Sequence, residues 1–212
     1  MYDVMDTEGD PLPTGVSAFE AAGVIDQTAL DRFAALIEKK DIFWKYVDMG
    51  DLKAGSIARL TRTALPGEKS AYKMRMNQNH NPNVQFATLA HELAHLFLGH
   101  LGQDKYLSIP IRPTQTHTQQ ELEAESTAYI VCTRNGVENQ SASYLKNYVE
   151  KDTTTERLDM YQIMRAAGQV ETLLGLAAHT KVDKPQKKRN ETLPLFPSNS
   201  PDNSPDLFET DS

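Results

Sequence analysis

The chain has 212 residues, a formal net charge of −7 and 39% hydrophobic residues, a composition that fits one globular domain of ordinary size. Its single cysteine, Cys132, excludes an intramolecular disulfide framework and favours a reducing, cytoplasmic location. No apolar stretch approaches the roughly 20 residues of a membrane-spanning helix, and the acidic first residues do not resemble a signal peptide. The net acidity also argues against a dedicated nucleic-acid binder, because such a protein neutralises phosphates with a basic surface.

The chain opens with residues 1–16, in which acids, glycines and prolines follow no helical or strand period, so we expect an irregular lead-in. The folded domain is expected to span residues 17–180. Within it, Gln27–Lys40 repeats apolar residues at the i, i+3, i+4, i+7 spacing of an amphipathic helix. Asp26 stands just before this helix and can cap it.

Three short segments carry strand patterns. The β-branched and aromatic residues of Ile42–Val47 predict one strand, and residues 57–63 predict a second. Tyr72–Met76 alternates apolar and basic side chains, which is typical of a strand with one buried face. The turn-forming residues Asn77–Asn83 that follow predict a loop.

Helices dominate the rest of the domain. Val84–His100 is the most apolar of them, and a second helix is predicted from about residue 118 to 134. Two further helices are expected at residues 141–149 and at about 155–176. The fold class predicted from these elements is α+β: helix-rich, with a short mixed or antiparallel sheet.

The composition changes after about residue 180. Residues 181–212 hold five of the eleven prolines and few apolar side chains, so they cannot bury enough surface to offset the entropy of ordering. We expect a disordered, solvated tail. A short motif that binds a partner is the alternative for this segment.

The central motif is His91-Glu92-Leu-Ala-His95 on the Val84–His100 helix, an HExxH pattern. Residues four apart lie one turn apart on the same helix face, so both imidazoles can reach one metal ion. Glu92 lies about 100° around the helix, where it can take a proton from water activated by the metal rather than bind the metal itself. The alternative is a pair of hydrogen-bonded histidines in the core with Glu92 on the surface.

The following helix offers three carboxylates for a third ligand, and a catalytic zinc site needs three protein ligands and one open position. Glu121 and Glu125 are four residues apart and share a face, whereas Glu123 points to the opposite side. We assign Glu121 as the ligand and Glu125 as the residue that orients His91 or His95 through its second ring nitrogen. Glu123 is expected to be solvated or in a salt bridge.

Other candidate residues have weaker signals. We expect His100 to cap the helix end, His117 to be a surface residue and Cys132 to be a buried thiol, while His80 has no informative spacing. Three side chains are candidates for stabilising the oxyanion of a peptide-hydrolysis intermediate: Tyr72, His117 and Tyr129. The Tyr72–Met76 strand is either an edge strand that pairs with an extended substrate or an ordinary strand of the sheet.

With these residues identified, the chain resembles the ImmA/IrrE family of zinc metallopeptidases. Phe86–His100 is similar to the family's FTLAHELGHLLLGH segment, and Glu121–Ala128 is similar to its ExEANxFA segment. The related metallopeptidase domain of ArdC antirestriction proteins shares part of this pattern. The resemblance covers about residues 55–175.

The resemblance implies a gluzincin-like α+β fold with one Zn²⁺ on His91, His95 and Glu121, and with Glu92 as the general base. Glu125 stands where the family usually has Asn or Asp. Family members cleave specific regulators such as repressors, often in mobile elements or stress responses, which implies a protein substrate. The helix-turn-helix of some relatives is not evident, so we do not expect DNA binding by this chain.

Two functions therefore stand side by side. One is a zinc-dependent metallo-endopeptidase that cleaves a specific regulatory protein. The other is a non-catalytic zinc-binding regulator or antirestriction-like accessory protein, which would need a fourth protein ligand such as His117 or Glu123. A set of two histidines and a glutamate would also accept Mn²⁺, Co²⁺ or Ni²⁺.

Overall fold

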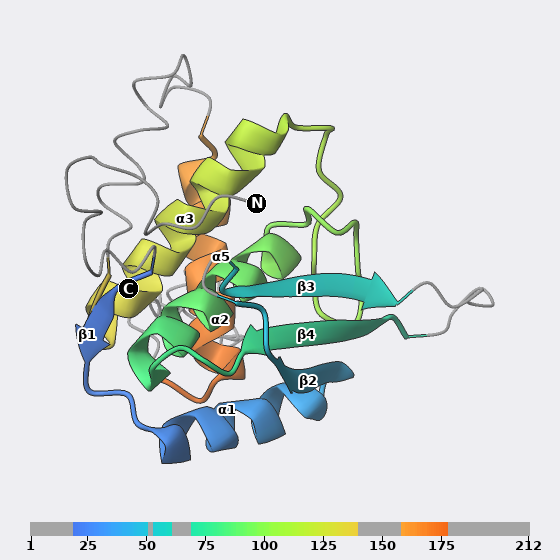
Figure 1. The fold of residues 1–212 in the computed structure, drawn as a ribbon. Helices are drawn as coiled ribbons and strands as arrows, with labels where there is room; N and C mark the ends of the chain where they lie inside the picture. The colour runs from blue at the N-terminus through green and yellow to red at the C-terminus, as the bar shows by residue number, and fades with distance from the viewer. Residues whose placement is uncertain (1–18, 51–52, 61–68, 140–157, 178–212) are drawn as a thin grey trace, which may run out of the picture. The chain divides into compact units, whose positions relative to one another are not determined.

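The structure is a computed structural model, and it describes residues 19–50, 53–60, 69–139 and 158–177 (Figure 1). Three predicted segments lie outside these residues: the lead-in 1–16, the helix at 141–149 and the tail 181–212.

A three-stranded mixed sheet forms one side of the described fold. Strand β4 (Ala71–Asn77) lies in the centre, parallel to β2 (Ile42–Val47) and antiparallel to β3 (Gly55–Leu60). Of the two alternatives for Tyr72–Met76, the ordinary strand of the sheet is confirmed and the edge strand is wrong, because β4 has a neighbour on each side. The edge strand that contacts the HExxH helix is β3. Its described part extends to Leu60, and residues 61–63 of the predicted strand lie outside the described part of the chain.

The alternation read from the sequence of β4 is confirmed. Tyr72, Met74 and Met76 are fully buried, whereas Lys73 and Arg75 are exposed. The buried side chains face the helices, because a strand presents successive side chains to opposite faces of its sheet.

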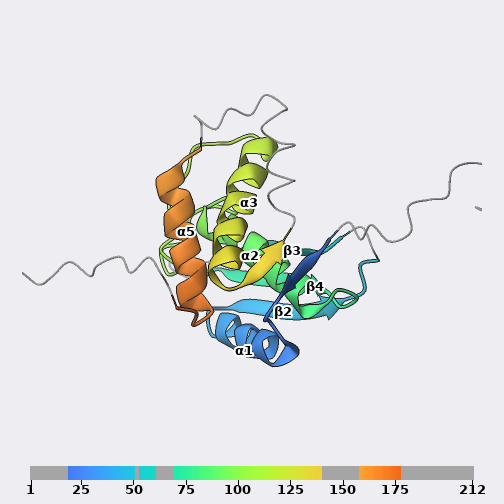
Figure 2. The ribbon, with the colours of Figure 1, turned by 90° about the vertical axis from the view of Figure 1, so that its left-hand side faces the viewer.

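Helix α1 (Gln27–Glu38) packs beside β2 at one edge of the sheet (Figures 1 and 2). Its buried residues are Leu30, Phe33 and Ile37, which follow the predicted amphipathic spacing. The Asp26 side chain accepts a hydrogen bond from the Ala29 amide at 2.8 Å, so the predicted cap is confirmed.

The HExxH helix, α2 (Pro82–Phe97), begins two residues before its predicted start and ends three before its predicted end. Asn81 caps it by accepting from the amides of Asn83 and Val84, and Pro82 occupies the first turn, where a missing N–H costs nothing. The helix cannot continue through Gly99, whose φ of +85° brings the chain against the Pro110 carbonyl.

The second motif helix, α3 (His117–Arg134), agrees with its prediction within one residue. Thr116 and Gln119 form a reciprocal capping box at its start. Helix α5 (Met160–Leu173) begins after its cap, Asp159, and ends three residues before its predicted end at 176. Residues 155–157 of the predicted helix lie outside the described chain.

Two short strands were not predicted. Strand β1 (Ala21–Gly23) pairs antiparallel with β5 (Val137–Asn139), so the chain just before α1 lies beside the chain that leaves α3. Three residues are too few to establish a period-2 pattern, so neither strand could be predicted from the sequence.

Helix α2 is the central element of this arrangement. It contacts β3 and β4 on one side and α3 and α5 on the other, and ten of its residues are buried. The predicted α+β fold, with the HExxH helix packed on a second Glu-bearing helix, is confirmed. Among the described helices, none is both long and apolar enough to cross a membrane.

Candidate metal centre

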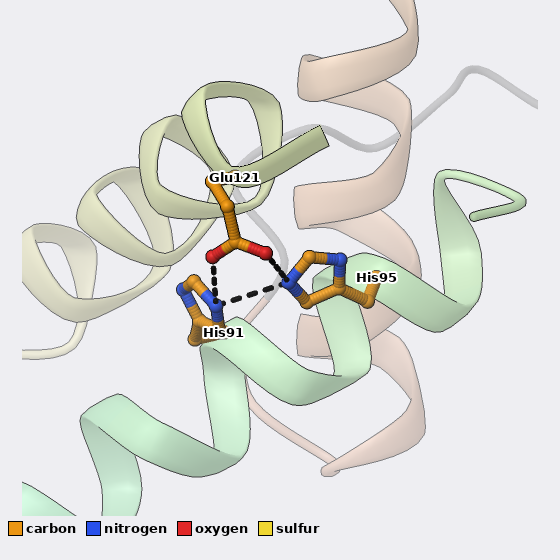
Figure 3. Close-up of side chains that lie close together, drawn as sticks. All are labelled: His91, His95 and Glu121. Atoms are coloured by element: carbon orange, nitrogen blue, oxygen red, sulfur yellow. Dashed lines mark hydrogen bonds and ion pairs between the residues drawn. The ribbon is translucent and has the colours of Figure 1, made fainter. Parts of the chain in front are cut away.

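His91, His95 and Glu121 meet where α2 packs on α3, and their polar atoms point toward one another (Figure 3). The Nε2 atoms of His91 and His95 lie 3.0 Å apart. The Glu121 carboxylate spans the pair, with Oε2 3.5 Å from His91 Nε2 and Oε1 3.4 Å from His95 Nε2. The three residues predicted as ligands are therefore brought together.

These separations fit a tetrahedral metal ion. Ligand atoms that share a tetrahedral zinc at about 2.0–2.1 Å lie about 3.3 Å from one another. The 3.0 Å between the two Nε2 atoms is close to one such edge, and one ligand atom from each of the three residues lies within 4.8 Å of the other two. In the part of the chain that the structure describes, the cluster comprises three residues that could hold a metal ion, which is the number of protein ligands in a catalytic zinc site.

The second ring nitrogen of each histidine has its own partner. His91 Nδ1 lies 2.9 Å from Glu125 Oε2, and His95 Nδ1 lies 2.8 Å from His100 Nδ1. Each imidazole therefore directs Nε2 toward the cluster. Glu125 occupies the position that its predicted orienting role requires, and it does so at His91 rather than at His95.

Glu92 lies beside the cluster and is held by the edge strand. Its Oε2 accepts a hydrogen bond from the Ile57 amide of β3 at 2.9 Å. Burial raises the pKa of Glu92 above its usual value, although cationic His91 and the Ile57 amide oppose the rise. A carboxylate with a raised pKa is suited to take a proton from water and to return it.

The carboxylates of Glu121 and Glu125 favour a positive charge at the cluster. Burial opposes protonation of His91, but hydrogen bonds to Glu121 and Glu125 outweigh it and raise the pKa of His91 to about 10. Burial and the neighbouring His91 cation lower the pKa of His95 to about 3. The hydrogen bond with His91 lowers the pKa of Glu121.

Glu123 forms a buried ion pair on the other side of α3. Both its oxygens accept from the Arg112 guanidinium, at 2.9 and 3.0 Å, and Oε2 lies 3.3 Å from His100 Nε2. Burial opposes ionisation, but the hydrogen bonds with His100 and Arg112 prevail and lower the pKa of Glu123 to about 2. Of the two predicted alternatives, the salt bridge is confirmed and the solvated side chain is wrong.

His100 was predicted to cap the end of the motif helix, and that prediction is wrong. Its side chain is only 2% exposed, and its ring nitrogens contact His95 and Glu123. The spacing of five residues from His95 takes His100 past the last turn of α2, where the chain folds back toward α3.

The remaining candidate residues differ in their exposure and in their contacts with the cluster. Tyr72 is fully buried and its hydroxyl donates to Asp104 Oδ2 at 2.9 Å, so it is not available to an oxyanion. His117 is a surface residue, as predicted, and its Nδ1 lies 3.6 Å from Glu121 Oε1. Tyr129 is 40% exposed on α3. Cys132 is buried, as predicted, and burial raises the pKa of its thiol to about 12.

Two groups at the site were missed by sequence reasoning. The Ile57 amide is a backbone group and has no residue signature. Arg112 lies in the connection between α2 and α3, where an isolated arginine looks like any solvated cation. The one available signal was Glu123, an acid between Leu122 and Ala124 on a helix that needs a buried face.

A sequence model described as the IrrE N-terminal-like domain (Peptidase_M78) matches residues 51–167, which is more than half of the chain. The match includes α2 and α3, and so all three residues of the cluster. No curated protein and no solved structure matches the chain.

Proposed function

The chain belongs to the IrrE N-terminal-like domain family of metallopeptidase-type proteins, and from this premise we propose that it is a zinc-dependent endopeptidase. The observation that carries the proposal is the cluster of His91, His95 and Glu121, in which one ligand atom from each residue lies within 4.8 Å of the other two. Zinc is the metal proposed, because two imidazoles and one carboxylate are a frequent catalytic zinc set.

A zinc ion bound here would supply Lewis-acid chemistry, polarising the scissile carbonyl and making water more acidic. The chain's own residues perform the proton transfers. Glu92 takes the proton of the attacking water, and its raised pKa then lets it deliver that proton to the leaving amine. The Ile57 amide fixes the Glu92 carboxylate in place for both steps.

His117 is the best placed of the three oxyanion candidates. Its ring lies beside Glu121 and is 86% exposed, so it can turn toward a bound substrate. Tyr72 is engaged with Asp104, and no contact connects Tyr129 to the cluster among the described residues. We therefore assign the stabilisation of the developing oxyanion to His117.

The substrate is proposed to be a protein, bound in an extended conformation along β3. Within the described residues β3 pairs only with β4, so its other edge can accept a further strand. The same strand holds Glu92, which places such a peptide next to the proton-transfer group. A repressor or another regulatory protein is the substrate class that the family resemblance favours.

The test compares zinc-loaded wild type with Glu92→Gln on a proteome-derived peptide library, with new N-termini read by mass spectrometry. Glu138→Gln, an exposed substitution on β5, is the matched control. We expect cleavage by the wild type and the control, and a loss of about 10²- to 10⁴-fold in Glu92→Gln with zinc still bound.

Equal cleavage by Glu92→Gln and the wild type would contradict the assigned base. No cleavage by fully zinc-loaded wild type, on the library or on proteins of the expression host, would favour the non-catalytic zinc-binding regulator.

A further inference from the structure

A chain of buried polar side chains extends from the metal cluster to the connection between α2 and α3. His95 Nδ1 contacts His100 Nδ1 at 2.8 Å, and His100 Nε2 contacts Glu123 Oε2 at 3.3 Å. Arg112 closes the chain with two hydrogen bonds to the Glu123 carboxylate. The side chains of His100, Glu123 and Arg112 are 2%, 1% and 10% exposed, so water does not compete for these bonds.

The direction of each hydrogen bond follows from Arg112, the last side chain of this series. Arg112 can only donate, so the Glu123 carboxylate accepts from it and has no proton to give to His100. His100 Nε2 must therefore donate to Glu123. In a neutral imidazole the other nitrogen is then an acceptor, so His100 Nδ1 accepts from His95 Nδ1.

The outcome at the metal cluster is a single tautomer of His95. With its proton on Nδ1, His95 presents the bare lone pair of Nε2 to His91 and Glu121. The reverse tautomer would place a proton where the metal must bind. His91 needs no intermediate residue, because its Nδ1 meets the Glu125 carboxylate directly.

We propose that His100 is a positioning residue for the metal site. Its hydrogen bond to Glu123, which Arg112 holds in place, orients the His100 ring, and the hydrogen bond between His100 and His95 then fixes the tautomer and the ring plane of His95. The inference rests on the proposed metal site and assigns a new role within it. It also explains why Arg112 of the connection and Glu123 of α3 form a buried ionic pair, where an apolar pair would pack at no cost in desolvation.

The test uses two nearly isosteric substitutions of His100. Both His100→Leu and His100→Asn remove the contact with Glu123, but the Asn carbonyl can still accept from His95 Nδ1, whereas Leu has no acceptor. Zinc affinity is measured by competition with a chromophoric chelator. We expect a loss of about 10- to 100-fold in His100→Leu and a much smaller loss in His100→Asn.

A second readout does not depend on cleavage, and its wild-type part does not depend on any variant folding. Long-range ¹H–¹⁵N spectra of the imidazoles in metal-free wild type should show His95 with its proton on Nδ1 and His100 with its proton on Nε2. In His100→Leu the His95 signals should shift toward the other tautomer.

Either of two results would overturn the proposal: His95 protonated on Nε2 in the wild type, or equal zinc affinity in His100→Leu and the wild type. These results are distinct from a failure of the proposed function, in which the wild type would bind no zinc or would bind it without cleaving any substrate.

Discussion

At the scale of single residues, the three acids of α3 have three different tasks within five positions. Glu121 faces both imidazoles, Glu125 holds the second nitrogen of His91, and Glu123 pairs with Arg112 on the opposite side. The helical spacing alone separates Glu123 from the other two. It does not distinguish Glu121 from Glu125, because that choice depends on how far α3 is shifted along α2.

Glu125 provides a residue-scale prediction. Replacing it with Ala removes the acceptor for His91 Nδ1, so zinc affinity should fall about 10- to 100-fold. Gln retains an acceptor oxygen and should lose less. Chelator competition on both variants and on Glu138→Gln, a control on the exposed face of β5, measures the effect. Wild-type affinity in Glu125→Ala would show that this carboxylate does not orient the ligand.

At the scale of elements, the site depends on the close approach of β3 to α2. A Cβ on Gly55 would lie 2.6 Å from Thr88 Cγ2 of α2 and 2.9 Å from the Arg75 carbonyl of β4. Only glycine permits this contact, and two residues further on the Ile57 amide reaches Glu92.

Gly55→Ala should therefore destabilise the protein by about 1–3 kcal/mol, because β3 must move away from α2. Urea unfolding of this variant beside Ala58→Ser, an exposed change on the same strand, gives the difference. If Gly55→Ala unfolds at the wild-type urea concentration, the strand does not need the close contact.

Tyr72 connects the sheet to the loop that follows α2. Its hydroxyl should make the stability of the fold depend on pH. Burial, and then the hydrogen bond and charge of Asp104, raise the pKa of Tyr72 to about 12. A phenol whose pKa is higher in the folded than in the unfolded state stabilises the fold below the unfolded pKa of about 10. That stability is lost as the pH rises from 10 toward 12.

Tyr72→Phe has no such titration. At pH 8 it should be less stable than the wild type by about 1–2 kcal/mol, because Asp104 loses a buried donor. Denaturant unfolding at a series of pH values should show this gap closing between pH 10 and 12. A gap that stays constant up to pH 12 would mean that the hydroxyl ionises without cost in the folded protein.

At the scale of the whole molecule, the sequence predicts most elements and less of their arrangement. Helices α1, α2 and α3 and strands β2 and β4 have periods or caps of their own, so local physics defines them. The central place of β4 and the pairing of β1 with β5 arise from contacts between distant segments, which no local pattern records.

The site likewise combines local features, which the sequence predicts, with contacts between distant segments, which it does not. HExxH fixes the His91–His95 face within one helix, and the four-residue spacing of Glu121 and Glu125 fixes theirs. The bond from Ile57 to Glu92 and the path from Arg112 to His100 join elements 11 to 35 residues apart. These contacts could not be predicted from the sequence, because several arrangements of α2, α3 and β3 satisfy the same sequence pattern.

The central claim is that α2 and α3 together hold one divalent metal ion through His91, His95 and Glu121. The most direct test is elemental analysis of purified wild type after incubation with zinc and removal of the excess, beside His95→Ala. His80→Ala is the matched control, because His80 lies in the loop before α2, outside the cluster. We expect about one zinc per chain in the wild type and the control and almost none in His95→Ala. Wild-type protein that retains no zinc, or a His95→Ala variant that retains it fully, would show that these three residues do not hold the ion.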